Sequence, residues 1–393
     1  MFYLNALILL GLVYGYTGWR LIDASPLGPP WPAVAWAAVL GCMLLVPGYM
    51  FFIRPRLARS GRGDWLAWIV YLTMGLFALT FGLTLIRDLA WALLWGLESL
   101  LALSGRPPLL DAAGRDLLWR SSATAVGVLS ILGWLYGLYA ARTPRVTRID
   151  IPLDDLPADL EGFRIVQLTD LHVGPTIKRP FVQKVVDQVQ TLAPDLIVFT
   201  GDLADGSVEH LSPHVAPLAG LKAPFGRFFA SGNHEYYSGV EAWLEQARHL
   251  GFLPLINQHH LITKGAARLL LAGVTDFNAA EIKPEHASDP KAALRQAPDS
   301  HLRILLAHQP RSIKAAAQAG FDLQLSGHTH GGQFVPWKYF IRLQQPYVAG
   351  LHRFADAWIY VSRGTGYWGP PLRLGAPAEI AHITLSKKTA TNP

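Results

Sequence analysis

Four long apolar stretches occupy the first third of the chain, and each is long enough to cross a bilayer. A hydrocarbon core about 30 Å thick requires about 20 apolar residues in a helix. Charged residues are absent from these stretches except close to their ends, where several tryptophans also lie and suit the headgroup layer. The stretches that we predict to be membrane-spanning helices are 2–22, 31–53, 65–86 and 117–141.

A shorter apolar stretch, 89–103, leaves the number of spans open because it contains Glu98. It is either an interfacial or re-entrant helix or a fifth span, and a fifth span would move the rest of the chain to the other side of the membrane. Glu98 is then either a buried functional carboxylate or an interfacial glutamate at the edge of a short helix. We expect four spans. We also expect the first stretch to be retained rather than cleaved, because no basic segment precedes it.

Arginine placement predicts the orientation of these helices. Basic loops stay on the cytoplasmic side, and with four spans the links after the second and fourth stretches lie on the same side. We therefore expect a multi-pass inner-membrane protein with both termini and the remaining chain in the cytoplasm. The arginines of these two links are Arg54, Arg56, Arg59, Arg62, Arg142, Arg145 and Arg148.

From residue 163 onward, short β-branched and aliphatic runs alternate with helical periodicity, a pattern typical of an α/β domain. Helices are expected at 179–193 and 240–251, and a loop with a short helix at 276–299. We therefore predict two domains, a transmembrane domain over 1–148 and an α/β domain over 149–393. The expected strands are 163–170, 195–202, 226–233, 268–276, 301–309, 322–330, 357–364 and 379–385.

Composition supports this division. Hydrophobic residues make up 51% of the chain and charged residues only 16%, against about 25% charged in an average soluble protein. Residues 1–148 contain 12 arginines and 6 acids, which accounts for the whole net charge of +6, and all 14 histidines lie in 149–393. The basic balance therefore encodes membrane orientation and does not indicate nucleic-acid binding. The single cysteine, Cys42, excludes an intrachain disulfide and a thiolate metal cluster.

Potential metal ligands follow nearly every predicted strand of the second domain. Loops at the carboxyl ends of neighbouring strands meet at one edge of a sheet, so these side chains are expected to converge. Imidazole and carboxylate groups without thiolate suit Mn, Fe, Zn or Co, and a carboxylate such as Asp202 can bridge two metal ions. The residues concerned are Asp170, His172, Asp202, Asn233, His234, His308, His328 and His330.

The order of these motifs resembles that of the calcineurin-like metallophosphoesterases. The series consists of DLH (170–172), GDLADG (201–206), GNHE (232–235), AHQP (307–310) and GHTHGGQ (327–333). A late SRGTGYWGPPLRLG segment (362–375) is similar to that of a membrane-associated phosphodiesterase branch of the family. The resemblance covers about residues 150–390 and implies a four-layer α/β/β/α sandwich with a dinuclear metal site.

The resemblance also implies roles for the site residues. The cofactors would be two divalent metal ions, with Mn, Fe, Zn, Co and Mg as alternatives. One ion would be held by Asp170, His172, Asp202 and His330. The other would be held by Asp202, Asn233, His308 and His328, so that Asp202 bridges the pair. His234 would contact the phosphate and assist the leaving group.

These residues predict a hydrolytic reaction. Divalent metals lower the pKa of bound water toward about 7, so a metal-bound hydroxide can attack phosphorus while protonated His234 stabilises the leaving oxygen. We expect a membrane-anchored phosphoesterase that hydrolyses a phosphodiester or pyrophosphate bond, with Asp202 and His234 as catalytic residues. A lipid-linked or amphipathic substrate fits an enzyme held by four spans. One alternative is a UDP-2,3-diacylglucosamine pyrophosphatase of lipid A synthesis, and another is a membrane sensor or transporter with a regulatory phosphoesterase domain.

Several questions stay open at this point. The expected partners are the membrane and a phosphoester substrate, with a lipid as one option, and the sequence does not define the head group, metal or oligomeric state. Arg363 and Arg373 either bind a substrate phosphate or pair at the surface. Asp205 either orients a ligand or the substrate, or it caps a turn. The pair Tyr367–Trp368 either lines a lipid-facing rim or packs a turn.

Overall fold

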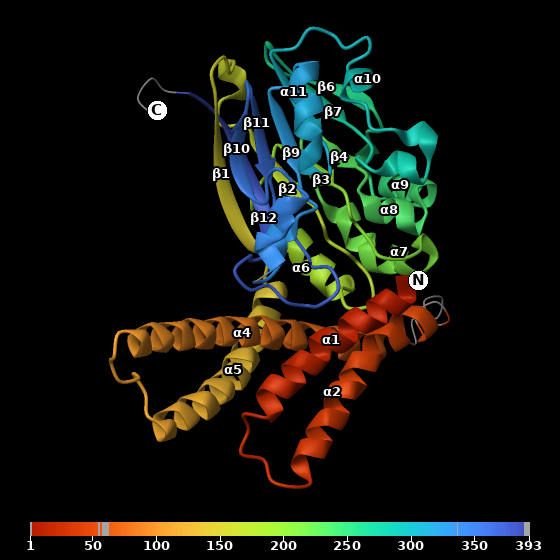
Figure 1. Cartoon of the computed structure of the whole chain (residues 1–393). Coiled ribbons are helices and arrows are strands. Elements are labelled where there is room, and N and C mark those ends of the chain that lie inside the picture. The colour runs from red at the N-terminus through yellow and green to blue at the C-terminus, as the bar shows by residue number, and fades with distance from the viewer. Residues whose placement is uncertain (1, 54–55, 57–62, 336, 389–393) are drawn as a thin grey trace. The chain divides into compact units, whose positions relative to one another are not determined.

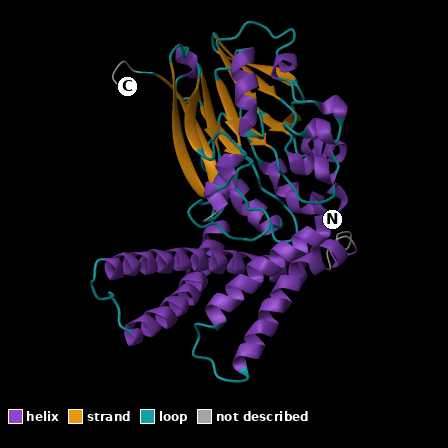
Figure 2. Cartoon of the chain, viewed as in Figure 1, coloured by secondary structure: helices purple, strands orange, loops and turns teal. Residues whose placement is uncertain are grey.

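The computed structural model describes residues 2–53, 56, 63–335 and 337–388 (Figure 1), so Arg54, Arg59 and Arg62 of the predicted basic link lie outside the described residues. The chain divides into two compact units, Met1–Leu138 and Tyr139–Pro393. The first unit is helical and the second combines helices with two sheets (Figure 2).

In the described part of the helical unit, four long helices lie at the positions of the predicted spans. They are α1 (Phe2–Ile22), α2 (Trp31–Pro47) with a π-helical continuation (Gly48–Ile53), α4 (Asp64–Leu103) and α5 (Ala112–Ala141). Within the described residues, three segments pass both length and hydropathy limits for a span, namely Trp31–Ile53, Asp64–Leu103 and Ala112–Ala141. The protein is therefore membrane-associated.

The apolar stretch 89–103 is not an element of its own, because it is the second half of α4. This helix has 40 residues, and a rise of 1.5 Å per residue gives a length of about 60 Å, twice the hydrocarbon core. Since no turn separates 65–86 from 89–103, the stretch is neither a re-entrant helix nor a fifth span. α5 runs antiparallel to α4, with the Trp134 indole N–H donating to the Leu72 carbonyl (3.1 Å) and Arg87 donating to the Trp119 carbonyl (3.0 Å).

Glu98 closes the turn between α4 and α5. Its carboxylate accepts a hydrogen bond from the Leu110 backbone N–H (3.3 Å) and pairs with Arg115 (3.2 Å). Both partners belong to the turn or to the start of α5, so the structure gives this carboxylate a structural role in the helical hairpin.

A charged cluster links the end of α1 to the middle of α4 and the first half of α5. Arg20 of α1 donates to Asp88 of α4 at 2.8 Å, and Arg87 donates to Ser122 of α5 at 2.9 Å. The Arg87 guanidinium lies over the Trp119 ring, 3.9 Å from its centroid. Because these charges are paired and lie at the ends of the predicted spans, the interiors of the spans remain apolar.

Two six-stranded sheets form the second unit. The order of the first is β1 (Arg145–Leu153), β12 (Glu379–Lys387), β2 (Arg164–Leu168), β3 (Leu196–Thr200), β4 (Arg227–Ala230) and β5 (Leu253–Pro254). The order of the second is β10 (Gly350–Phe354), β11 (Ala357–Val361), β9 (Leu323–Ser326), β8 (Leu302–Leu306), β7 (Ala267–Gly273) and β6 (Gln258–Lys264). The strands from β2 to β5 are parallel to one another, and so are β7, β8, β9 and β11.

The alternation of side chains along each strand builds four layers. In β3, Leu196 and Val198 enter the core between the sheets, whereas Ile197 and Phe199 pack against the outer helices. α6 (Arg179–Gln190), α7 (Val208–Val215) and α9 (Val240–His249) cover the first sheet, and α10 (Pro290–Ala293) and α11 (Ile313–Ala319) cover the second. The predicted α/β/β/α sandwich is therefore confirmed (Figure 2).

All eight strands expected from the sequence are present, but most end earlier than predicted. Their last predicted residues leave the strand and form the loops that carry potential metal ligands, as at Asp170 after β2 and His308 after β8. The strands β1, β5, β6 and β10 were not expected. Each lies at or next to the edge of its sheet and exposes some of its side chains, so none shows the continuous apolar run of a buried strand.

Candidate dinuclear metal site

Five of the eight predicted site residues have a left-handed backbone. Each follows a strand, and the φ angles lie between 50° and 70° for Asp170, His172, Asp202, His328 and His330. Non-glycine residues seldom adopt positive φ, and such strain persists where the surrounding structure imposes it, which occurs most often at functional sites. The loops at this edge are therefore shaped for the side chains that they present.

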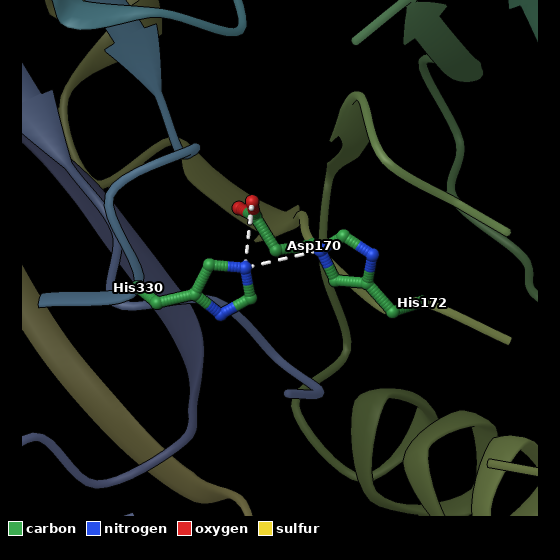
Figure 3. A group of neighbouring side chains, drawn as sticks. All are labelled: Asp170, His172 and His330. Carbon is green, nitrogen blue, oxygen red and sulfur yellow. Dashed lines mark hydrogen bonds and ion pairs between the residues drawn. The ribbon is translucent and has the colours of Figure 1, made fainter. Parts of the chain in front are cut away.

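Asp170, His172 and His330 form a first buried group of donors, shown in Figure 3. The Nε2 atoms of His172 and His330 lie 3.0 Å apart, and Asp170 Oδ1 lies 3.4 Å from His330 Nε2. Two ligands at right angles around one cation, with bonds of about 2.1 Å, are separated by about 3.0 Å. The spacing of the two imidazoles thus fits a single metal ion.

Asp202, His308 and His328 form a second group. Asp202 Oδ2 lies 3.1 Å from His308 Nε2, which in turn is 3.2 Å from His328 Nδ1. The same Asp202 oxygen is 3.7 Å from His172 Nε2 in the first group. One carboxylate oxygen therefore faces both groups.

Asn233 borders the second group and carries an orphaned acceptor. Its Oδ1 atom is buried and has no hydrogen-bond partner in the described part of the chain. The next residue, His234, donates its backbone N–H to Asp202 Oδ1 at 2.9 Å. Buried acceptors are rarely left without a partner, so the Asn233 oxygen fits a place in a cation's coordination shell.

Hydrogen bonds to Nδ1 orient the His172 and His308 rings so that their Nε2 lone pairs point into the site. Asp205 Oδ1 lies 2.9 Å from His172 Nδ1, and the Thr200 carbonyl lies 2.7 Å from His308 Nδ1. Since both partners only accept, each Nδ1 carries the proton and each Nε2 lone pair faces the donor groups. Burial, aided by the charge of Arg373, holds the pKa of His330 well below its usual value.

The donors therefore fit two divalent cations. They are imidazole nitrogens and carboxylate or amide oxygens, and nothing among them resembles a purely structural thiolate zinc site. All eight predicted residues lie in this one place. Asp170, His172 and His330 line one group, Asp202, His308 and His328 line the other, and Asn233 and His234 adjoin Asp202.

His234 lies next to both donor groups, and with His172 and Asp205 it forms a third group of potential metal donors. Its Nε2 is 3.9 Å from Asp202 Oδ2, and its Nδ1 is 2.6 Å from Asp205 Oδ1. Burial alone would lower the pKa of His234, but the carboxylates of Asp202 and Asp205 outweigh it and raise the pKa to about 9. The raised pKa favours the protonated ring, which can donate a proton. Of the alternatives for Asp205, the structure supports the orientation of histidines.

Glu235 is a supporting residue that the sequence analysis did not identify. The side chain is fully buried and accepts hydrogen bonds from the backbone N–H groups of Asp202 (3.0 Å), Leu203 (2.7 Å) and Gly232 (2.7 Å). Burial and the nearby Asp202 raise its pKa to about 7. An acid in the first turn of a helix, here α8 (Asn233–Ser238), at the end of the GNHE motif was the available signal.

Two glycines allow the loops to approach the carboxylates closely. A Cβ atom at Gly232 would collide with Asp202 Oδ1, and one at Gly327 would collide with Asp170 Oδ2. Neither position has room for a larger residue unless the carboxylate moves. The glycines of the GNHE and GHTH motifs are therefore required by contact with the donor groups.

The segment 362–375 contacts the metal site through Arg373, which hydrogen-bonds His330 on the side away from the donor groups. Arg373 is fully buried and donates to the carbonyls of His330 (2.7 Å), Arg363 (2.7 Å) and Gly366 (3.1 Å), while its Nη2 lies 2.9 Å from His330 Nδ1. Arg363 pairs with Glu379 at 2.9 Å. Arg373 is thus placed to position His330 and is too deeply buried for a direct contact with substrate.

Tyr367 and Trp368 have different environments. Tyr367 is buried in the core, whereas Trp368 is 54% exposed with its ring centroid 5.7 Å from that of His234. Gln333, the last residue of GHTHGGQ, fixes this position because its side chain accepts from the Trp368 N–H (3.0 Å) and donates to the Trp368 carbonyl (2.9 Å). One residue of the pair therefore packs the loop, and the other faces the site entrance.

Comparisons with known proteins identify relatives of this chain. The family model for calcineurin-like phosphoesterases matches residues 163–332. A zebrafish (Danio rerio) protein described as a transmembrane protein with metallophosphoesterase domain is 33% identical, over 98% of this chain and 89% of its own length. A cattle (Bos taurus) protein of the same description is 41% identical, over 67% of this chain and 62% of its own. An uncharacterized metallophosphoesterase of Helicobacter pylori is 38% identical, over 66% and 69%.

Proposed function

The chain belongs to the calcineurin-like phosphoesterase family, and from this premise we propose that it hydrolyses a phosphodiester or pyrophosphate bond in a lipid-linked or amphipathic substrate. It is a membrane-associated, metal-dependent phosphoester hydrolase whose cofactors are two divalent ions. We assign one ion to Asp170, His172, Asp202 and His330, and the other to Asp202, Asn233, His308 and His328. The observation that carries this assignment is the single Asp202 oxygen facing both donor groups.

The chain's own residues would position the phosphate and supply a proton. Bound metal ions would polarise the phosphoryl group, acidify water and offset the charge that develops on the phosphoryl oxygens. His234 would protonate the leaving oxygen through Nε2, because Asp205 holds the opposite side of the ring at Nδ1. Asp205 would also keep His172 and His234 in fixed orientations, since its Oδ1 contacts both rings.

Two features support an amphipathic substrate. The family domain is joined to apolar helices that can cross a membrane. The exposed rings of Tyr237 and Trp368 flank His234, with centroids 5.4 Å and 5.7 Å from that of the imidazole. A leaving group with apolar atoms beside the ester oxygen would therefore contact aromatic surface.

An assay of the full chain tests this function. The protein, reconstituted in lipid, is loaded with Mn, Co, Zn or Mg and supplied with bis(4-nitrophenyl) phosphate, lipid phosphodiesters and a UDP-linked diacyl sugar. We expect hydrolysis that requires metal, disappears with a chelator and is faster on the amphipathic substrates. Absence of metal-dependent hydrolysis on every substrate would contradict the function, and a strict preference for the UDP-linked sugar would identify the pyrophosphatase alternative.

We also propose that the catalytic domain, assigned to residues 149–393, faces the cytoplasm of an inner membrane. This orientation requires α1 to cross the membrane together with the three candidate spans, which gives an even number of crossings. It is supported by the arginines 142, 145 and 148 that follow α5. An alkaline phosphatase fusion at Thr143 is expected to be inactive, because that reporter needs the periplasm. An active fusion would place the domain outside.

A further inference from the structure

The exposed apolar side chains of the sheet-containing part gather at one edge. Among its described residues after α5, eight large hydrophobic side chains are exposed, and all but Leu253 lie on the connections, including short helices, that follow the C-terminal ends of β4, β7, β9 and β11. These loops also surround the metal site. We name the seven residues the apolar rim, and they are Tyr237, Phe277, Ile282, Tyr339, Phe340, Leu343 and Trp368.

The rim extends to the reacting centre. Tyr237 and Trp368 contact the His234 ring, as described above. The segment 338–343 adjoins the same site, because the Lys338 backbone packs so closely on Gly332 of GHTHGGQ that no side chain fits there. Exposed aromatic rings therefore lie beside the imidazole that would meet the leaving group.

The segment 338–343 has the composition of a membrane interface. Within KYFIRL, Lys338 and Arg342 supply positive charge, and Leu343 is 83% exposed. Neither Asp nor Glu occurs between residues 331 and 355. Cations among aromatic and aliphatic side chains favour the headgroup region of a bilayer with anionic lipids, where the rings and Leu343 reach the acyl boundary.

We propose that the apolar rim docks on an anionic bilayer surface and presents the metal site to phosphoesters held in that surface. Large exposed apolar patches on soluble domains usually mark interaction sites. The chain is already attached to the membrane through its helices, so the effective concentration of bilayer is high and a weak patch suffices. The substrate part of this inference rests on the proposed function, whereas the docking part does not.

Site-directed fluorescence tests the docking directly. The full chain with Cys42→Ser, which removes the single cysteine, receives Leu343→Cys on the rim or Leu253→Cys on β5 as the matched control. Each variant is labelled and reconstituted in phosphatidylethanolamine–phosphatidylglycerol vesicles that contain doxyl lipids. We expect quenching at position 343 but not at 253, and weaker quenching at 343 in phosphatidylcholine vesicles. Equal quenching at both positions, or protection of 343 from iodide without lipid quenching, would overturn the proposal, the latter by indicating a protein partner.

Activity tests the consequence for substrate. Leu343→Asp is expected to lower kcat/KM on a bilayer-held phosphoester about tenfold, while hydrolysis of soluble bis(4-nitrophenyl) phosphate and both activities of the control Leu253→Asp stay unchanged. If Leu343→Asp lowered kcat/KM equally on both substrates, or on neither, the proposal that the rim presents the site to bilayer-held substrate would be overturned. If the wild type hydrolyses neither substrate, the proposed function fails, and the quenching result still decides whether the rim docks.

Discussion

Asp202→Asn is expected to lower kcat/KM for any phosphoester by about a thousandfold while the chain stays folded. Asp202 is 2% exposed and its Oδ2 lies 3.1 Å from His308 Nε2 and 3.7 Å from His172 Nε2, so an amide would remove the one charge shared by both donor groups. Metal ions supply several kcal/mol of transition-state stabilisation, and each 1.36 kcal/mol corresponds to a factor of ten in rate. Losing a bridging ligand should forfeit much of that stabilisation.

The measurement pairs steady-state kinetics with metal content and thermal unfolding. The exposed Asp356 provides a matched control, since Asp356→Asn makes the same chemical change away from the donor groups. We expect the Asp202 variant to bind fewer than two metal ions per chain, with a cooperative unfolding transition. Full activity together with two bound ions would show that Asp202 is not the bridge.

His234→Asn is expected to lower kcat by about 10²–10⁴-fold, the usual contribution of a general acid. Its Nε2 is 3.9 Å from Asp202 Oδ2 and we do not assign it to either metal, so the metal content should remain unchanged. The loss should be larger for alkyl leaving groups than for 4-nitrophenolate, which departs without protonation. A similar loss on both kinds of ester would argue against proton donation by His234.

Asp205→Asn tests whether kcat depends on the proton carried by His234, because the substitution should change the pH dependence of kcat. The carboxylate lies 2.6 Å from His234 Nδ1, and together with Asp202 it raises the pKa of His234 to about 9 despite burial. Since removing an anion lowers the pKa of a neighbouring imidazolium, the alkaline limb of the kcat profile should move to lower pH. Asp205 also contacts His172, so the substitution could weaken metal binding as well. Measuring the metal content of the variant distinguishes that loss from the change in the pKa of His234. An unmoved alkaline limb would mean that His234 does not limit the rate in that range.

The candidate metal ligands could be found in the sequence because each depends on a short segment. A buried strand followed by Asp, Asn or His places that side chain at the carboxyl edge of a sheet, and parallel strands share that edge. Asp170, Asp202 and His308 follow this rule, and the structure brings them together. The candidate membrane spans could also be predicted from single segments, because the length and hydropathy of one segment are enough to define a candidate span.

The supporting residues depended on contacts between segments far apart in the chain. Arg373 lies 43 residues from His330, and Asp205 lies 33 residues from His172, so no motif spacing links them. Glu235 was part of a recognised motif, and one of its backbone partners, Gly232, lies in that motif, but Asp202 and Leu203 belong to a loop that only the folded sheet places beside it. Such residues differ from ordinary turn or surface residues only by what surrounds them.

The sequence by itself determined that apolar spans precede an α/β domain with nitrogen and oxygen ligands at its strand ends, since periodicity and residue type carry that information. Tertiary structure decided that 65–103 is one helix, that Tyr367 is buried while Trp368 faces His234, and that Arg373 lies behind His330. It also gathered the exposed apolar side chains around the site. The physical reason is that burial and proximity are properties of packed segments, and a linear pattern specifies each segment without specifying its neighbours.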